Sequence, residues 1–270
     1  MAVSIDVMFA PNLTCTHKTP HLRPYLADLH VHTVLSPCAE VEMIPPLIVK
    51  RAGDLALGII AITDHNSAEN VAAVIEAAQG FDLTVLPGME VQTREEVHLL
   101  CLFDTVEQAL DWQAVVYAHL PPLKNNAKVF GPQFVVDATG DFICYNDRLL
   151  ATSTSLSVEE VTGGVEAKEG LCIAAHIDRP SFSLLANLGF VPQGVRFAAM
   201  EITHNANADQ IRHQHPSLAG YSFVCSGDAH RLGEMSNKTI LTLSEPTITE
   251  ISMAFRGQAG RKVKVVEDEH

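Results

Sequence analysis

Short apolar runs alternate with longer helix-like segments along most of the chain, and this alternation restricts the fold more than any other feature. The run "GIIAITDH" (58–65), for example, is followed by "SAENVAAVIEAAQG" (67–80), which has helical spacing and ends in a glycine. Similar apolar runs occupy 24–32, 83–91, 96–103, 170–178, 196–205, 221–230 and 238–244. Further helices are predicted at 42–57, 105–120, 157–169, 206–214 and 247–257. This pattern favours a parallel α/β sheet, and we predict that the sheet closes into a barrel.

We divide the chain into an irregular lead-in at 1–24, which contains three prolines, and one large domain at 25–270. With 270 residues and 47% hydrophobic content, the chain can form one substantial core. One stretch breaks the alternation: "FVVDATGDFICYND" (134–147) is typical of an antiparallel hairpin that turns at "ATGD". We therefore predict a small insertion, with this hairpin, at about 121–155.

Acidic residues outnumber basic ones by 32 to 18, and the net charge of −14 bears on the choice of partner. A uniformly acidic surface repels a long phosphate backbone. We therefore expect a small phosphorylated substrate, with nucleotides among the candidates, and no duplex DNA. A metal ion or a local arginine would supply the positive charge that a small anion needs.

We expect a reduced, cytoplasmic protein that does not bind membranes. The segment "MAVSIDVMFA" has no basic region and includes Asp6, so it is a poor signal peptide. No apolar run approaches the ~20 residues that a membrane helix needs. The six cysteines form no CxxC pair and several lie within apolar runs, so a disulfide framework is not expected.

Histidines and carboxylates stand at or near the ends of the apolar runs. These residues are His30, His32, Asp64, His65, Glu90, His98, His176, Asp228 and His230. In a parallel barrel the C-terminal ends of all strands meet at one face, so these side chains are expected to converge. Residues i and i+2 of a strand point the same way, so His30 and His32 offer two imidazoles to one ion. Imidazole with carboxylate ligands suits Zn, Mn or Fe.

A second HxH pair, His213 and His215 in "IRHQHP", has the same spacing but follows a polar, helix-like segment. Residues two apart on a helix do not face each other. We therefore expect this pair to face solvent and to bind no metal.

Five motifs give the chain a resemblance to a known family. They are "DLHVHT" (28–33), "ITDHN" (62–66), "GMEV" (88–91) with His98 beyond it, "AAHIDRP" (174–180) and "SGDAH" (226–230). In this order they resemble the motifs of the PHP (polymerase and histidinol phosphatase) superfamily, and most closely its stand-alone phosphoesterases. The resemblance implies a distorted (βα)7 barrel with a metal site at the C-terminal ends of the strands.

The same resemblance implies two to three divalent ions. The first would take His30, His32, Glu90 and Asp228, the second Glu90, His98 and His176, and the third His65 and His230. Many relatives complete the third site with an Asp or His shortly after the HxH motif. Here the segment reads "SPCAEVE" (36–42), so we predict that Glu40 or Glu42 completes the site, with Cys38 as the least favoured alternative.

We predict a phosphoric ester hydrolase that uses metal-activated water on a small phosphate ester, a nucleotide or a short oligonucleotide. His204 or Asp64 would protonate the leaving oxygen, although Asp64 suits the orientation of an imidazole better. Arg179 would pair with the phosphate. The alternatives are a metal-dependent amidohydrolase and a non-catalytic metal-binding regulatory module. Assays of phosphate release and of amide hydrolysis distinguish the three.

Overall fold

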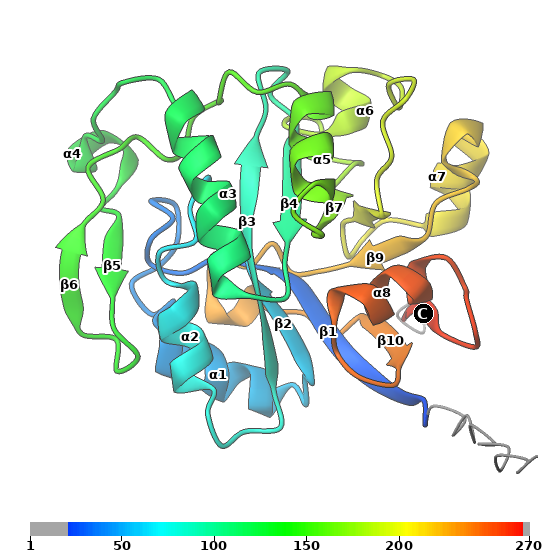
Figure 1. Ribbon diagram of the computed structural model, residues 1–270, viewed down its shortest axis with the longest axis horizontal. Coiled ribbons are helices and arrows are strands. Elements are labelled where there is room, and N and C mark those ends of the chain that lie inside the picture. The colour runs from blue at the N-terminus through cyan, green and yellow to red at the C-terminus, as the bar shows by residue number, and fades with distance from the viewer. Residues whose placement is uncertain (1–20, 267–270) are drawn as a thin grey trace, which may run out of the picture.

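Nine strands form one curved sheet in the computed structural model, which describes residues 21–266 (Figure 1). The strands lie in the order β11-β10-β1-β2-β3-β4-β7-β8-β9. Their bounds are β1 Arg23–Val31, β2 Ile59–Ile62, β3 Thr84–Gln92, β4 His98–Leu102, β7 Leu171–Ala174, β8 Ala199–Ile202, β9 Phe223–Cys225, β10 Thr239–Leu243 and β11 Lys262–Val265. The segment after β9 returns to β1 through a parallel bridge between Val31 and Ala229. The sheet is therefore nearly closed, which confirms the predicted α/β barrel.

The strands do not all run in one direction. β1, β2 and β3 are parallel, as are β7, β8 and β9. β4 runs antiparallel to both β3 and β7. β10 pairs antiparallel with β1, and β11 pairs antiparallel with β10 at the edge of the sheet. This departs from the fully parallel sheet that the alternation predicted. Only residues 93–97 connect β3 to β4, and a parallel crossover needs a dozen residues or more.

The two faces of the sheet carry two separate apolar cores. Strand residues such as Ile60 face outward and pack with helix residues such as Ile48 and Trp112. Their neighbours, such as Ile59, face inward and pack with residues of helix α8 such as Phe255. Successive side chains of a strand point to opposite faces, so strands that are buried on both faces read as continuous apolar runs.

Helices pack mainly on the outer face of the barrel (Figure 1). Their bounds are α1 Pro45–Asp54, α2 Val71–Ala77, α3 Val106–His119, α4 Ala127–Phe130, α5 Val158–Glu166, α6 Leu184–Asn187, α7 Ala208–Gln214 and α8 Ile248–Phe255, with short 3-10 turns at Pro216–Leu218 and Leu232–Glu234. Each predicted helix is present but shorter. α3 begins with a capping box between Thr105 and Gln108, and α5 begins with one between Ser157 and Glu160.

The region predicted as an insertion holds α4 and a separate two-stranded sheet, β5 (Phe134–Val136) with β6 (Phe142–Tyr145). The strands are antiparallel and turn at Asp137–Asp141, so the predicted hairpin is confirmed. The hairpin is anchored beside the loop that follows β1, because the Phe134 amide donates to the Val34 carbonyl at 3.0 Å. Of the predicted lead-in at 1–24, residues 1–20 lie outside the described part, and β1 already begins at Arg23.

No helix between residues 21 and 266 combines the length and the apolar character needed to cross a membrane.

Candidate metal centre

The end of β1 brings His30 and His32 close to Asp228, which follows β9 and is distant from them in the sequence. The Nε2 atoms of the two histidines are 3.1 Å apart. Each of them lies 3.2 Å from Oδ1 of Asp228. All three residues are buried. They form one group of ligand atoms that could hold a metal ion.

Glu90, near the end of β3, lies at the centre of the cluster and contacts five histidines. Its Oε1 atom is 2.7 Å from Nδ1 of His98, 3.2 Å from Nε2 of His176 and 3.3 Å from Nε2 of His30. Its Oε2 atom is 2.8 Å from Nδ1 of His65 and 3.5 Å from Nε2 of His32. A carboxylate in this position can link two neighbouring ion sites.

His98 reaches the cluster because of the reversed strand. It is the first residue of β4, and the start of an antiparallel strand lies at the same edge as the ends of its neighbours. His176, by contrast, follows the end of β7 and has a left-handed backbone with φ of 27°. Asp228 is left-handed too, with φ of 46°. Such strained non-glycine residues concentrate at functional sites.

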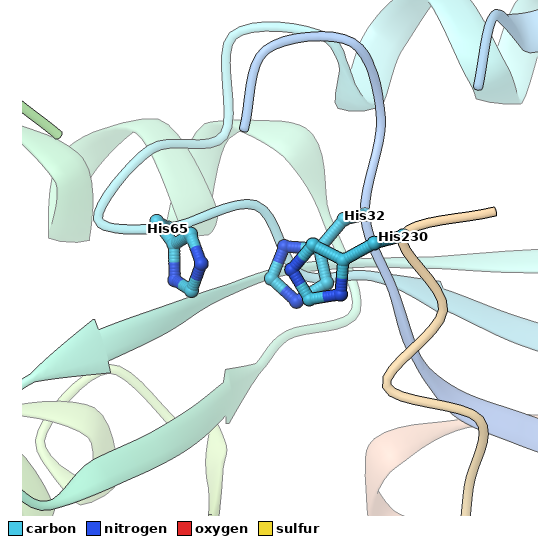
Figure 2. Close-up of side chains that lie close together, drawn as sticks. All are labelled: His32, His65 and His230. Atoms are coloured by element: carbon cyan, nitrogen blue, oxygen red, sulfur yellow. The ribbon is translucent and has the colours of Figure 1, made fainter. Parts of the chain in front are cut away.

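His32, His65 and His230 form a second group of nitrogen ligands at the outer side of the cluster (Figure 2). The rings of His32 and His230 are stacked with centroids 4.0 Å apart, and His65 faces them. The Cys38 thiol lies beside these rings, with its Sγ atom 3.3 Å from Nε2 of His65. Burial alone would raise the pKa of the Cys38 thiol, but hydrogen bonds to His230 and His65 outweigh it and lower the pKa to about 6.

Neither glutamate that we predicted for this position reaches the histidines. The Glu40 Oε1 atom pairs with the Arg231 Nε atom at 2.9 Å, on the exposed surface. Glu42 is exposed as well. The backbone turns over 36–40, where the amide of Glu40 donates to the carbonyl of His230 at 2.9 Å. In this turn the Cys38 side chain points toward the histidines, whereas the Glu40 side chain points away from them.

Several residues that support the cluster were missed by the sequence reasoning. Glu201 of β8 is 1% exposed, and its Oε2 atom accepts a hydrogen bond from Nδ1 of His30 at 2.9 Å. Ser36 holds His32 in the same way, with its Oγ atom 2.9 Å from Nδ1. The only signal for Glu201 in the sequence is a single carboxylate inside the apolar run "FAAMEI" (197–202).

Asp64 lies behind the histidines and does not contact the cavity. Its carboxylate accepts three hydrogen bonds of 2.7 Å, from the amide and hydroxyl of Thr33 and from the hydroxyl of Ser36. Burial raises the pKa of Asp64, and these hydrogen bonds oppose the rise. With its oxygens occupied, Asp64 orients Ser36 and through it His32, which is the supporting role considered for it.

Arg179 and His204, the other candidates for catalysis, line a cavity of about 860 Å³ that opens beside the cluster. The Arg179 Nη1 atom lies 2.5 Å from Oδ2 of Asp228, and 43% of its side chain is exposed. His204 is exposed on the same wall. Two further basic residues, Arg231 and Lys238, also line this cavity. The cavity therefore brings three basic side chains next to the cluster, together with the carboxylates of Glu201, Asp228 and Glu234.

The electrostatics of the cluster favour a positively charged ligand. Burial would lower the pKa of His30, but the carboxylates of Asp228, Glu201 and Glu90 outweigh it and raise that pKa well above its ordinary value. Burial would raise the pKa of Glu90, but the surrounding histidines hold it well below its ordinary value. Several buried polar atoms have no hydrogen-bond partner, among them Oε2 of Glu90, Nε2 of His98 and Oδ1 of Asp228. Imidazole nitrogens and carboxylate oxygens arranged in this way fit a divalent transition metal.

The other HxH pair lies apart from the cluster. His213 belongs to α7 and is exposed, and His215 follows the end of that helix. Neither belongs to a group of potential metal ligands among the described residues.

The chain is similar to a known domain family and to known enzymes. The PHP domain family model matches residues 28–182, which is more than half of the chain. The 5'-3' exoribonuclease Rnm of Salmonella typhimurium is 34% identical over 80 residues, which cover 28% of this chain and 26% of that protein, and Rnm of Escherichia coli matches equally. The match thus spans about a quarter of the length of these curated relatives.

Solved structures share the fold at low identity. The lesion-specific endonuclease Q of Pyrococcus furiosus has a TM-score of 0.67 and 18% identity, covering 89% of this chain and 58% of that one. A complex of endonuclease Q with a 27-mer duplex substrate, with an abasic lesion at the active site, has a TM-score of 0.63 and 17% identity over the same shares. A putative metal-dependent phosphoesterase of Bifidobacterium adolescentis has a TM-score of 0.51 and 20% identity, covering 77% and 88%.

These relatives contradict our expectation of a small phosphorylated substrate and no duplex DNA. One of them is an exoribonuclease, and another was solved in complex with a duplex substrate that has an abasic lesion at the active site. The charge argument is wrong because net charge averages the whole surface, whereas a phosphate group meets individual basic side chains such as Arg179, Arg231 and Lys238, which line the cavity.

Proposed function

The chain belongs to the PHP domain family and is a metal-dependent phosphoesterase, and from this premise we propose that it is a nuclease that cleaves phosphodiester bonds of a nucleic-acid strand. The observation that carries the proposal is the cavity in which three basic side chains lie beside the histidine–carboxylate cluster. These basic side chains can contact the phosphates of a polyanion that extends beyond the reacting group. The similarity to an exoribonuclease and to an endonuclease supports the same substrate class.

We propose that the cluster would hold two inner ions, with Glu90 placed to serve both, and a third ion at the outer side. His30, His32 and Asp228 would hold the first ion, His98 and His176 the second, and His65 and His230 the third. Zn, Mn and Fe fit these donors. Bound ions supply a coordinated water of lowered pKa and neutralise charge on the phosphate.

The remaining residues bind, orient and move protons. Arg179 lies on the cavity wall within reach of Asp228, and its planar guanidinium suits a phosphate oxygen pair. His204, exposed on the same wall, is in a position to protonate the leaving oxygen. Asp64 orients the first histidines rather than taking part in proton transfer, because its oxygens already accept three hydrogen bonds.

The test is hydrolysis of end-labelled strands by protein loaded in turn with Zn, Mn or Fe. The substrates are single-stranded RNA, single-stranded DNA, and duplex DNA with and without an abasic site, with an aryl phosphate and an amide substrate beside them. We expect strand cleavage to exceed hydrolysis of the aryl phosphate. Loaded protein that cleaves only the aryl phosphate would overturn the nucleic-acid proposal. Turnover of the amide alone would identify an amidohydrolase, and no turnover at all would identify a binding module.

Substitution of Arg179 tests one of these basic side chains directly. Arg179→Ala should raise KM for strands about 10-fold or more, because a charge-assisted phosphate contact is worth about 1.5–3 kcal/mol. Arg94→Ala is the matched control, since Arg94 is 59% exposed and pairs with Glu95 and Glu160 rather than lining the cavity. Equal KM values for both variants and the wild type would remove Arg179 from the site.

A further inference from the structure

Cys38 occupies a position that the loop after β1 fixes firmly. The amide of Ala39 donates to the carbonyl of Ser36 at 2.9 Å, and the amide of Glu40 donates to the carbonyl of His230 at 2.9 Å. These two bonds tie the loop to itself and to the segment after β9. Cys38 between them has its Sγ atom 3.3 Å from Nε2 of His65 and lines the cavity. The thiol therefore faces the outer histidines and is open to solvent.

A second observation marks the same place as a ligand site. The ligand nitrogens of His32, His65 and His230 all lie within 4.8 Å of one another. The Nδ1 atom of His230 is engaged with the carbonyl of Asp228 at 2.9 Å, which leaves Nε2 for another partner. Asp228 itself is 8% exposed, and its Oδ1 atom, 3.6 Å from Nδ1 of His230, has no hydrogen-bond partner.

The acidic residues of the loop do not compete for this place. Glu40 pairs with Arg231 on the surface, and Glu42 is exposed. Of the candidates in "SPCAEVE", Cys38 is the residue whose donor atom lies beside the imidazoles.

We propose that Cys38 is a ligand of the outermost ion together with His65 and His230, which makes this site a mixed thiolate–imidazole site. The proposal rests on the metal centre proposed above and gives its outer ion a different chemistry. Thiolate selects softer ions such as Zn or Fe(II), whereas Mn and Mg prefer oxygen. The two inner positions, built from imidazole and carboxylate, can accept Zn, Mn or Fe. The protein therefore combines a thiolate-selected outer ion with less selective inner ions.

The experiment is titration of the metal-free protein with Co²⁺ while the absorption spectrum is recorded. A thiolate bound to Co²⁺ gives an intense near-ultraviolet charge-transfer band, which imidazole and carboxylate ligands do not give. Wild type should develop this band, and Cys38→Ser should lose it while still binding Co²⁺ at the inner positions. Cys144→Ser is the matched control, because Cys144 is an exposed cysteine on β6 that is not among the residues lining the cavity.

A competition experiment tests the selectivity. In Cys38→Asp, where a carboxylate replaces the thiol, the preference of the outer ion for Zn over Mn should fall at least about 10-fold. An identical band in wild type and Cys38→Ser, or unchanged Zn preference in Cys38→Asp, would overturn the thiolate ligand. Neither measurement uses a substrate, so a wrong assignment of the nuclease activity would leave both results intact. Absence of any Co²⁺ binding by wild type would overturn the metal centre as well.

Discussion

Two histidines of the cluster are held at their Nδ1 atoms by side chains outside the proposed set of metal ligands. Glu201 contacts Nδ1 of His30, and Ser36 contacts Nδ1 of His32. Each contact leaves the Nε2 atom directed at Asp228. A partner on one ring nitrogen fixes the tautomer and the orientation of the ring, and so raises the affinity of the other nitrogen for metal.

Glu201→Gln tests this support. The amide keeps the shape but removes the charge next to His30, so we expect the affinity for the first ion to fall about 10- to 100-fold. Titration of the metal-free variant against a metal-buffered indicator measures this. Glu166→Gln, an exposed substitution on α5, is the control and should match wild type. Unchanged affinity in Glu201→Gln would mean that the contact with His30 is structural only.

At the residue scale, sequence order identified the histidines that the structure gathers, but it did not identify their supports. His30, His65 and His230 were recognisable because each ends an apolar run inside an ordered motif. Glu201 was not, because a carboxylate within a strand is compatible with either face, and its burial against His30 depends on the closure of the barrel. The loop at 36–40 posed a different problem. Spacing alone does not give the direction of a turn, so Glu40 was preferred to Cys38.

Among the elements, β4 departs most from the sequence-based prediction. The apolar run at 96–103 indicated a strand, but its direction depended on the connection to β3. The five residues between β3 and β4 allow only an antiparallel return, and this return carries His98 to the edge where the other ligands lie. β11 was missed because "KVKV" alternates at the surface and lacks the long apolar run of the central strands. The short helices α4 and α6 were missed too, as each spans four residues.

Two adjacent glycines of α5 provide a matched pair of substitutions. A Cβ atom on Gly164 would overlap the indole of Trp112 in α3, whereas one on Gly163 would meet nothing within 4 Å. Gly164→Ala should lower the free energy of unfolding by about 1–3 kcal/mol through overpacking. Gly163→Ala should raise it by roughly 0.5–1 kcal/mol, because alanine loses less backbone entropy in a helix.

Urea denaturation of both variants measures these changes. Equal stabilities of Gly163→Ala and Gly164→Ala would show that α5 does not pack against Trp112 as described, because helix propensity alone would affect the two positions alike.

At the scale of the whole molecule, the metal centre connects most of the barrel. The proposed ligands come from β1, β3, β4 and from the loops after β2, β7 and β9. Ions that bind only the folded state stabilise it by about 2.7 kcal/mol at a free concentration of 100 times Kd. Removal of the ions should therefore weaken the entire barrel rather than one loop.

Chelation should lower the Tm by several degrees, and return of the preferred ion should restore it. Glu90→Gln is the informative variant, because Glu90 contacts histidines of more than one ligand group and its loss should weaken two ions together. Its Tm should respond less to chelator than that of wild type. The double variant His213→Ala, His215→Ala is the control and should respond fully. A wild-type Tm that is insensitive to chelator would argue against ions as part of the fold.

The bridge between Val31 and Ala229, which closes the barrel, joins segments that are synthesised far apart in time during translation. His30 leaves the ribosome about 200 residues before Asp228, its partner at the proposed first ion. At about 10 residues per second, roughly 20 s pass before that partner exists. During this time the nascent chain has the two imidazoles of the proposed first site but lacks the carboxylate of Asp228. Acquisition of the proposed first ion would therefore follow the synthesis of β9, and a chain interrupted before that point would lack Asp228, however much metal the cell supplies.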